Sequence, residues 1–93
     1  MTPRLTAITG PLKGQIFPLN EAAISLGRES ANRICVSDLS VSRRHCVFEK
    51  EEEQFRVTDL NSRNGTFIRI NGEVELKPGD MILIGRQLFR FEV

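Results

Sequence analysis

The chain has 93 residues, of which 40% are hydrophobic and 27% are charged, values typical of one globular domain with a modest core. Its formal net charge of +1 provides no global field that would draw the protein to nucleic acid or to a membrane surface. The longest apolar stretches span only a few residues and resemble neither a transmembrane segment nor a signal peptide, so we expect a single cytoplasmic domain over residues 1–93.

The first half of the sequence predicts four short strands, each followed by a turn residue. Gly10-Pro11 closes the first strand, Pro18 marks the end or an edge position of the second, and Gly27 ends the third. In chain order, these strands cover residues 5–8, 14–19, 23–26 and 33–36.

The second half predicts two hairpins and a closing pair of strands. A solvated acidic turn at Lys50–Glu53 joins the strands of the first hairpin. Asn71-Gly72 is the strongest short hairpin signal in the chain, and Pro78-Gly79-Asp80 forms a further turn. The predicted strands cover residues 45–49, 55–58, 66–70, 81–84 and 88–93.

No window of the sequence shows a sustained helical period. Turn signals recur about every ten residues, which favours an all-β sandwich of short strands. We expect most of the six phenylalanines to lie in its core.

The two cysteines, Cys35 and Cys46, lie in apolar, strand-like surroundings. We expect both to be reduced, buried thiols that act as small hydrophobic side chains. A zinc site formed by Cys35, His45 and Cys46 would lack a fourth ligand and the usual Cys-x-x-Cys spacing. We therefore expect no bound metal and no other cofactor.

Three polar loops interrupt the apolar strands. Arg28 directly follows the strand that ends at Gly27, and the second loop runs from Asp38 to His45. The third loop, residues 59–66, is dense in amide, hydroxyl and guanidinium groups. A hydroxyl donor beside a planar, permanently charged guanidinium is what proteins use to hold a phosphate.

These loops predict a separation of charge if the strands bring them to one end of the molecule. Four glutamates, Glu49, Glu51, Glu52 and Glu53, would then gather elsewhere, so that a dipolar molecule has a nearly neutral total charge. The groups expected to converge are Arg28, Ser42, Arg43, Arg44, Arg63 and Asn64.

Three short motifs, Gly27-Arg28, Ser42-Arg43-Arg44-His45 and Asn64-Gly65-Thr66, occur in this order. Their order and spacing resemble the GR…SxxH…NG pattern of the forkhead-associated (FHA) domain, and the resemblance extends over residues 5–93. It implies a β-sandwich of two antiparallel or mixed sheets, with short strands and with binding loops at one end. It also implies a non-catalytic signalling module that binds phosphothreonine-containing proteins or peptides, and neither nucleic acid nor membrane. Modules of this kind often belong to larger signalling or transcription-regulating proteins.

The resemblance assigns a role to each polar residue at the predicted binding end. Arg28 would grip the phosphate or set the peptide backbone beside it. Ser42 would donate its hydroxyl to a phosphate oxygen, and Arg43 would add a further phosphate contact. Asn64 would hydrogen-bond the peptide main chain, and Arg63 stands at the neighbouring position that touches the ligand.

Other residues of the motifs are expected to support the site without touching the ligand. His45 would brace its loop from beneath, while Gly27 and Gly65 keep the backbone tight. From its own turn-forming sequence, Asp59 is expected to brace the third loop, and Arg44 is expected to be solvated.

The sequence departs from the family pattern at three places. Arg43 stands where some members carry Asn, so the site is expected to be more cationic than theirs. Arg63 replaces a small hydroxyl residue, and the segment between Thr66 and Asn71 is about two residues longer than the common pattern.

Three other functions compete with phosphothreonine binding. The first is a phosphate-independent docking or dimerisation module of the same fold. The second is a hydrolase that uses Ser42, His45 and Asp59 as a triad, although no nucleophile-elbow sequence surrounds the serine. The third is a nucleic-acid binder, which the balanced net charge and the lack of interleaved aromatic residues disfavour.

Overall fold

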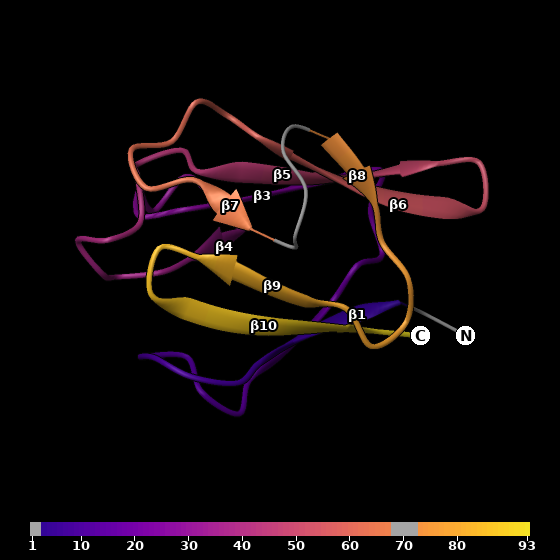
Figure 1. Cartoon of the computed structure of the whole chain (residues 1–93), viewed down its shortest axis with the longest axis horizontal. Helices are drawn as coiled ribbons and strands as arrows, with labels where there is room; N and C mark the ends of the chain where they lie inside the picture. The colour runs from indigo at the N-terminus through magenta and orange to yellow at the C-terminus, as the bar shows by residue number, and fades with distance from the viewer. Residues whose placement is uncertain (1–2, 68–72) are drawn as a thin grey trace.

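The computed structural model describes residues 3–67 and 73–93, and the described part of the chain consists of strands, turns and loops without a helix. Two sheets of short strands lie face to face (Figure 1). The ten strands are β1 (Arg4–Ala7), β2 (Ile16–Pro18), β3 (Ala23–Gly27), β4 (Ile34–Cys35), β5 (Cys46–Glu51), β6 (Gln54–Asp59), β7 (Thr66–Phe67), β8 (Glu73–Glu75), β9 (Met81–Ile84) and β10 (Gln87–Glu92).

Each sheet contains five strands. One has the order β2-β1-β10-β9-β7 and the other the order β4-β3-β5-β6-β8. All neighbouring strands are antiparallel except β3 and β4, which run parallel and pair Leu26 with Ile34 and Gly27 with Cys35. This is the predicted all-β sandwich of antiparallel and mixed sheets, and the prediction is confirmed.

The core forms between the inner faces of the two sheets because alternate side chains of each strand point inward. In β10, Phe89 and Phe91 are buried while Leu88, Arg90 and Glu92 are only partly covered. In the other sheet Ile24, Phe48 and Val57 are paired across β3, β5 and β6, and each is at most 2% exposed. Burial of such apolar surface is the main stabilising contribution to a domain of this size.

Most of the predicted strands occur where they were expected, but their limits differ. The acidic turn is shorter than predicted, because β5 extends to Glu51 and β6 begins at Gln54. Only Glu52 and Glu53 form the turn, and Glu52 has a φ of 59°. The predicted Asn71-Gly72 hairpin and the longer segment between Thr66 and Asn71 lie largely outside the described residues.

The prediction that both cysteines are buried is wrong for Cys35. β4 has only two residues, of which Ile34 points into the core and Cys35 is exposed. Cys46 is fully buried, and neither cysteine forms a disulfide. Burial raises the pKa of the Cys46 thiol far above its ordinary value, so this thiol stays protonated and unreactive.

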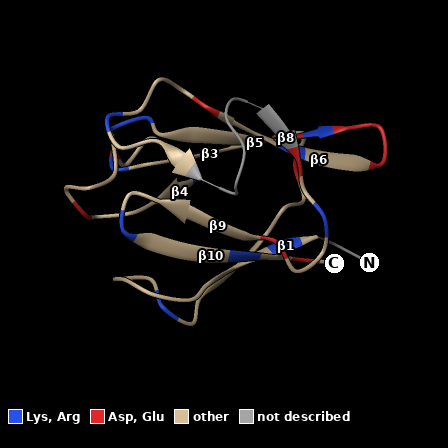
Figure 2. Cartoon of the chain, in the orientation of Figure 1, with Lys and Arg blue, Asp and Glu red and all other residues tan. Residues whose placement is uncertain are grey.

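The two ends of the sandwich carry opposite charge (Figure 2). The turn between β5 and β6 forms an acidic end, whereas the loops β3–β4, β4–β5 and β6–β7 lie together at the opposite, basic end. The predicted separation of charge is therefore confirmed. Among the residues that the structure describes, no helix is long and apolar enough to cross a membrane.

Candidate functional site

The β4–β5 loop is held against the end of β3. The backbone N–H groups of Arg28 and Glu29 donate to the carbonyl oxygens of Ser42 and Arg43, at 3.0 and 3.2 Å. Gly27 is buried at this junction, and a Cβ atom on it would lie 2.2 Å from the Arg43 carbonyl oxygen. The close approach of the two segments therefore requires a residue without a side chain at position 27.

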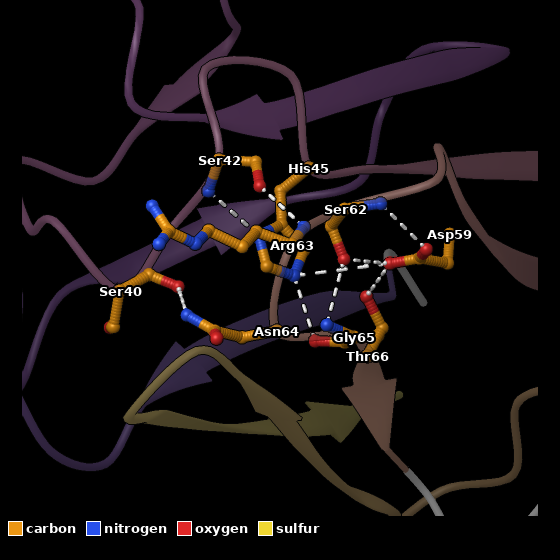
Figure 3. Close-up of polar contacts among 9 residues, drawn as sticks. All are labelled: Ser40, Ser42, His45, Asp59, Ser62, Arg63, Asn64, Gly65 and Thr66. Carbon is orange, nitrogen blue, oxygen red and sulfur yellow. Dashed lines mark hydrogen bonds and ion pairs between the residues drawn. The ribbon is translucent and has the colours of Figure 1, made fainter.

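His45 connects the β4–β5 loop to the β6–β7 loop from below (Figure 3). Its fully buried ring accepts the Ser42 backbone N–H at Nδ1, 3.0 Å away, and lies with Nε2 2.8 Å from the Gly65 carbonyl oxygen. An amide N–H can only donate and a carbonyl oxygen can only accept. These partners therefore fix a neutral imidazole with its proton on Nε2.

The β6–β7 loop is folded around the carboxylate of Asp59. This carboxylate accepts hydrogen bonds from the backbone N–H of Ser62 at 2.9 Å, from the Ser62 hydroxyl, and from the Thr66 hydroxyl at 2.8 Å. Partial burial raises the pKa of Asp59, but the bonds from Ser62 and Thr66 outweigh it and hold the pKa below its ordinary value. Asn61 and Gly65 complete the turn with φ angles of 58° and 83°.

The β4–β5 and β6–β7 loops meet through two further hydrogen bonds (Figure 3). The backbone N–H of Arg63 donates to the Ser42 hydroxyl oxygen at 2.9 Å, and the Asn64 amide nitrogen donates to the Ser40 carbonyl oxygen at 2.8 Å. Because the Ser42 oxygen acts as an acceptor here, its own O–H remains available as a donor to a ligand.

Arg28 approaches the same loop through its side chain. Its Nε donates to the Val41 carbonyl oxygen at 3.1 Å, and within the described residues its side chain has no other partner. The two terminal amino groups of this half-buried guanidinium are thus directed by a fixed anchor and can still bind a ligand.

The structure therefore brings most of the predicted site residues together. Arg28, Ser42, Arg63 and Asn64 are joined by the contacts above, and Arg43 is exposed next to Ser42. The remaining predicted arginine, Arg44, is exposed and lines an open hollow of about 490 Å³ with Asp59, Leu60 and Asn61. Its expected solvation is confirmed.

The sequence model of the FHA domain matches residues 24–85, which hold β3 to β9 and all three loops. The chain belongs to the FHA domain family. The glycogen accumulation regulator GarA of Mycobacterium tuberculosis is 39% identical to this FHA domain over 80 residues, a match that covers 83% of this chain and 49% of GarA. The oxoglutarate dehydrogenase inhibitor of Corynebacterium glutamicum is 38% identical over 80 residues, covering 83% of this chain and 55% of that protein. The chain thus spans about half the length of the curated relatives it matches.

Solved FHA structures superpose on nearly the whole chain. Mycobacterium tuberculosis EmbR in complex with a low-affinity phosphopeptide has a TM-score of 0.90 and 33% identity, covering 99% of this chain and 24% of EmbR. An FHA domain from a study of phosphothreonine-dependent interactions also has a TM-score of 0.90, with 27% identity over 100% of this chain and 97% of its own.

One side of this FHA domain's site was not anticipated from the sequence. Ser40 donates its N–H and hydroxyl to Asp38 Oδ1 at 2.8 and 2.6 Å, and its hydroxyl oxygen accepts the Arg86 N–H at 3.0 Å. The side-chain hydrogen bond from Ser40 is the largest of several effects that lower the pKa of Asp38. A Cβ on Gly85 would lie 2.5 Å from the Ser40 carbonyl oxygen, so the β9–β10 turn packs directly on the loop. The Asp-x-Ser sequence is a recognisable turn signal, but nothing local in the sequence connects it to Gly85.

The same geometry contradicts the hydrolase alternative. His45 contacts the backbone N–H of Ser42 and not its hydroxyl, and its other nitrogen is occupied by the Gly65 carbonyl oxygen. Asp59 Oδ1 lies 3.9 Å from His45 Nε2 and is engaged by Ser62 and Thr66. Neither His45 nor Asp59 is therefore placed as the general base that a Ser42 nucleophile would require. Among the described residues, no group of three or more His, Cys, Asp and Glu side chains could hold a metal ion.

Proposed function

We propose that the chain is a non-catalytic signalling module that binds phosphothreonine-containing protein segments. The carrying observation is the arrangement of two neighbouring groups. The Ser42 oxygen accepts the Arg63 N–H while its O–H remains free, and the guanidinium of Arg28 is anchored on the carbonyl oxygen of the adjacent residue, Val41. A free hydroxyl donor and a guanidinium held by one nitrogen form a site for phosphate oxygens.

In this proposal each predicted residue makes a defined contact. Arg28 and Ser42 hold the phosphate, the exposed Arg43 adds a second guanidinium, and Arg63 and Asn64 border the peptide. The Asn64 amide already donates to Ser40, so its carbonyl oxygen and second N–H are the groups that pair with peptide main chain. A phosphothreonine carries about −1.5 to −2 charges and three strong acceptor oxygens, which suit this donor set.

His45, Gly27 and Gly65 support the site in the same proposal. His45 holds Ser42 and Gly65 at fixed separation, Gly27 admits the Arg43 carbonyl, and Gly65 supplies the positive φ that closes the third loop. Because these supports exist without a ligand, little ordering entropy is lost on binding, and we expect affinities of about micromolar for a short peptide.

The comparisons support a regulatory role of this kind. The relatives that share about half their length with this chain are named as a regulator and an inhibitor, and EmbR is described with a phosphopeptide. We infer that this chain acts in signal transduction, including regulation of transcription or of an enzyme. We also place it in the cytoplasm, with a phosphorylated protein as its partner.

The decisive experiment compares a phosphothreonine peptide with its unphosphorylated form by isothermal titration calorimetry. Arg28→Ala and Ser42→Ala should each weaken binding of the phosphopeptide by at least about tenfold, because a charge-assisted contact is worth about 1.5–3 kcal/mol, while both proteins stay folded at the temperature of the titration. Ser37→Ala is the matched control, since Ser37 is an exposed serine of the same loop. Equal binding of the two peptides would instead favour a phosphate-independent docking module.

A further inference from the structure

The arginines of the described residues differ in whether their charge is matched inside the molecule. Five form ion pairs with carboxylates and lie mostly along the strands. These pairs are Arg4 and Arg90 with Glu92, Arg33 with Glu21, Arg56 with Glu51, and Arg86 with Asp38. In contrast, the guanidinium groups of Arg43, Arg44 and Arg63 have no hydrogen-bond or ion-pair partner within the described part of the chain. All three lie at the basic end, in the β4–β5 and β6–β7 loops.

The carboxylates at this end are engaged elsewhere or lie apart from these arginines. Asp38 is held by Ser40 and Arg86, and Asp59 by Ser62 and Thr66. Glu29 is exposed on the β3–β4 loop and forms no ion pair with any described residue. The end of the molecule therefore carries an excess of positive charge that its own acidic side chains do not neutralise.

One phosphothreonine can contact only some of these arginines. Its dianion, at about −2, is matched by Arg28 and Arg43 alone. The Arg63 guanidinium then has no anionic partner on the phosphothreonine. Its backbone N–H nevertheless donates to the Ser42 hydroxyl oxygen at 2.9 Å, which holds Arg63 at the border of the phosphate position. In Figure 3 its side chain extends from this point toward the Ser40 side of the site.

We propose that Arg63 selects ligands in which the phosphothreonine is accompanied by a second anionic side chain. This inference rests on the proposed function and adds a specificity to it: the preferred partner carries an acidic or a second phosphorylated residue close to the phosphothreonine. The planar guanidinium fork matches both carboxylate and phosphoryl oxygens, which is the chemistry that the two kinds of residue share.

Arg44, like Arg63, is exposed and has no hydrogen-bond or ion-pair partner among the described residues, but it does not offer the same subsite. Asp59 lines the same hollow as Arg44, and its negative charge would repel a second anion. Arg44 therefore provides a control that removes the same charge from the same end of the molecule without removing the proposed contact.

The test measures fluorescence anisotropy with three kinds of peptide that share one phosphothreonine. The first has neutral neighbours, the second carries one Asp at each neighbouring position in turn, and the third carries a second phosphothreonine at the position that the Asp scan selects. Relative to the peptide with neutral neighbours, the protein with Arg63 should bind the doubly phosphorylated peptide roughly tenfold more tightly and the best Asp peptide roughly threefold more tightly. These ratios are expected for one charge-assisted contact that is partly exposed. Arg63→Ser should reduce both preferences to less than about twofold while still binding the neutral phosphopeptide. Arg44→Ser should keep both preferences.

The outcomes separate this inference from the proposed function. Phosphothreonine-dependent binding with no preference for a second anion, or a preference that survives Arg63→Ser, would overturn the role of Arg63 and leave the phosphothreonine site intact. If Arg63→Ser and Arg44→Ser lost the preference for a second anion equally, the preference would arise from the overall positive potential of the basic end and not from a contact of Arg63. Failure of every phosphopeptide to bind better than its unphosphorylated form would overturn the proposed function itself.

Discussion

At the scale of single residues, the site depends on side chains that can both donate and accept hydrogen bonds. Ser42 accepts through its oxygen and keeps its O–H, and His45 accepts at Nδ1 and donates at Nε2. The imidazole is fully buried, so any change that removes one of its nitrogens leaves a buried backbone group without a partner. Position and protonation of these side chains are therefore fixed before a ligand arrives.

His45→Ala should destabilise the whole domain and not only the site. The substitution leaves the Ser42 N–H and the Gly65 carbonyl unpaired and creates a cavity, for which we expect a loss of roughly 2–4 kcal/mol in the free energy of unfolding. Urea denaturation followed by circular dichroism measures this loss, and phosphopeptide binding should weaken in parallel. A stability unchanged from that of the natural protein would show that His45 does not brace the loops.

Much of this residue-level detail follows from the sequence, and one part does not. The order of Gly27-Arg28, Ser42, His45 and Asn64-Gly65 identifies the binding loops because the family pattern is a set of local motifs. The contact of Arg86 with Ser40 joins residues 46 positions apart, and no motif marks it. Such contacts depend on how two turns pack, which only the folded structure determines.

At the scale of secondary-structure elements, the junction between β3 and the β4–β5 loop limits what residue 27 can be.

Alternation along β3 and β5 is clear in the sequence, so the prediction of these strands is right. The two-residue strand β4 is too short for its alternation to be read, which explains why Cys35 is exposed although its neighbours are apolar. Edge position and strand length, and not composition, decide the burial of such a residue.

Gly27→Ala should displace the β4–β5 loop, because the added Cβ would meet the Arg43 carbonyl oxygen at 2.2 Å. We expect a loss of roughly 1–3 kcal/mol in stability, as for other overpacked positions, together with weaker phosphopeptide binding. Gly14→Ala is the control: Gly14 has a φ of 89° with no atom within 4 Å of the added Cβ, so this variant should lose stability through backbone strain alone. Calorimetric titrations and melting curves measure binding and stability for both variants. Equally tight peptide binding by Gly27→Ala and Gly14→Ala would contradict the role of Gly27.

At the scale of the whole molecule, the free energy of unfolding should depend on pH through the carboxylate of Asp59. The folded protein holds the pKa of Asp59 below its ordinary value of 3.8, so the ionised carboxylate stabilises the fold at neutral pH. That contribution is present above the ordinary pKa and is lost as the pH falls through the lower, folded value. Urea midpoints should therefore fall between about pH 5 and pH 2. Asp59→Asn should be less stable at pH 7, and its urea midpoint should fall less steeply as the pH is lowered. An equally steep fall of the midpoint in this variant would assign the acid sensitivity to other groups.

The placement of acidic and basic residues at opposite ends has a kinetic consequence (Figure 2). A molecule with such a dipole experiences a torque in the field of an anionic partner and turns its binding loops toward that partner during the diffusional encounter. Association should then be faster than for an unsteered module of the same size, and the association rate should decrease as salt is added while the dissociation rate changes less. The acidic hairpin would thus contribute to recognition without ever touching the ligand, by orienting the approach.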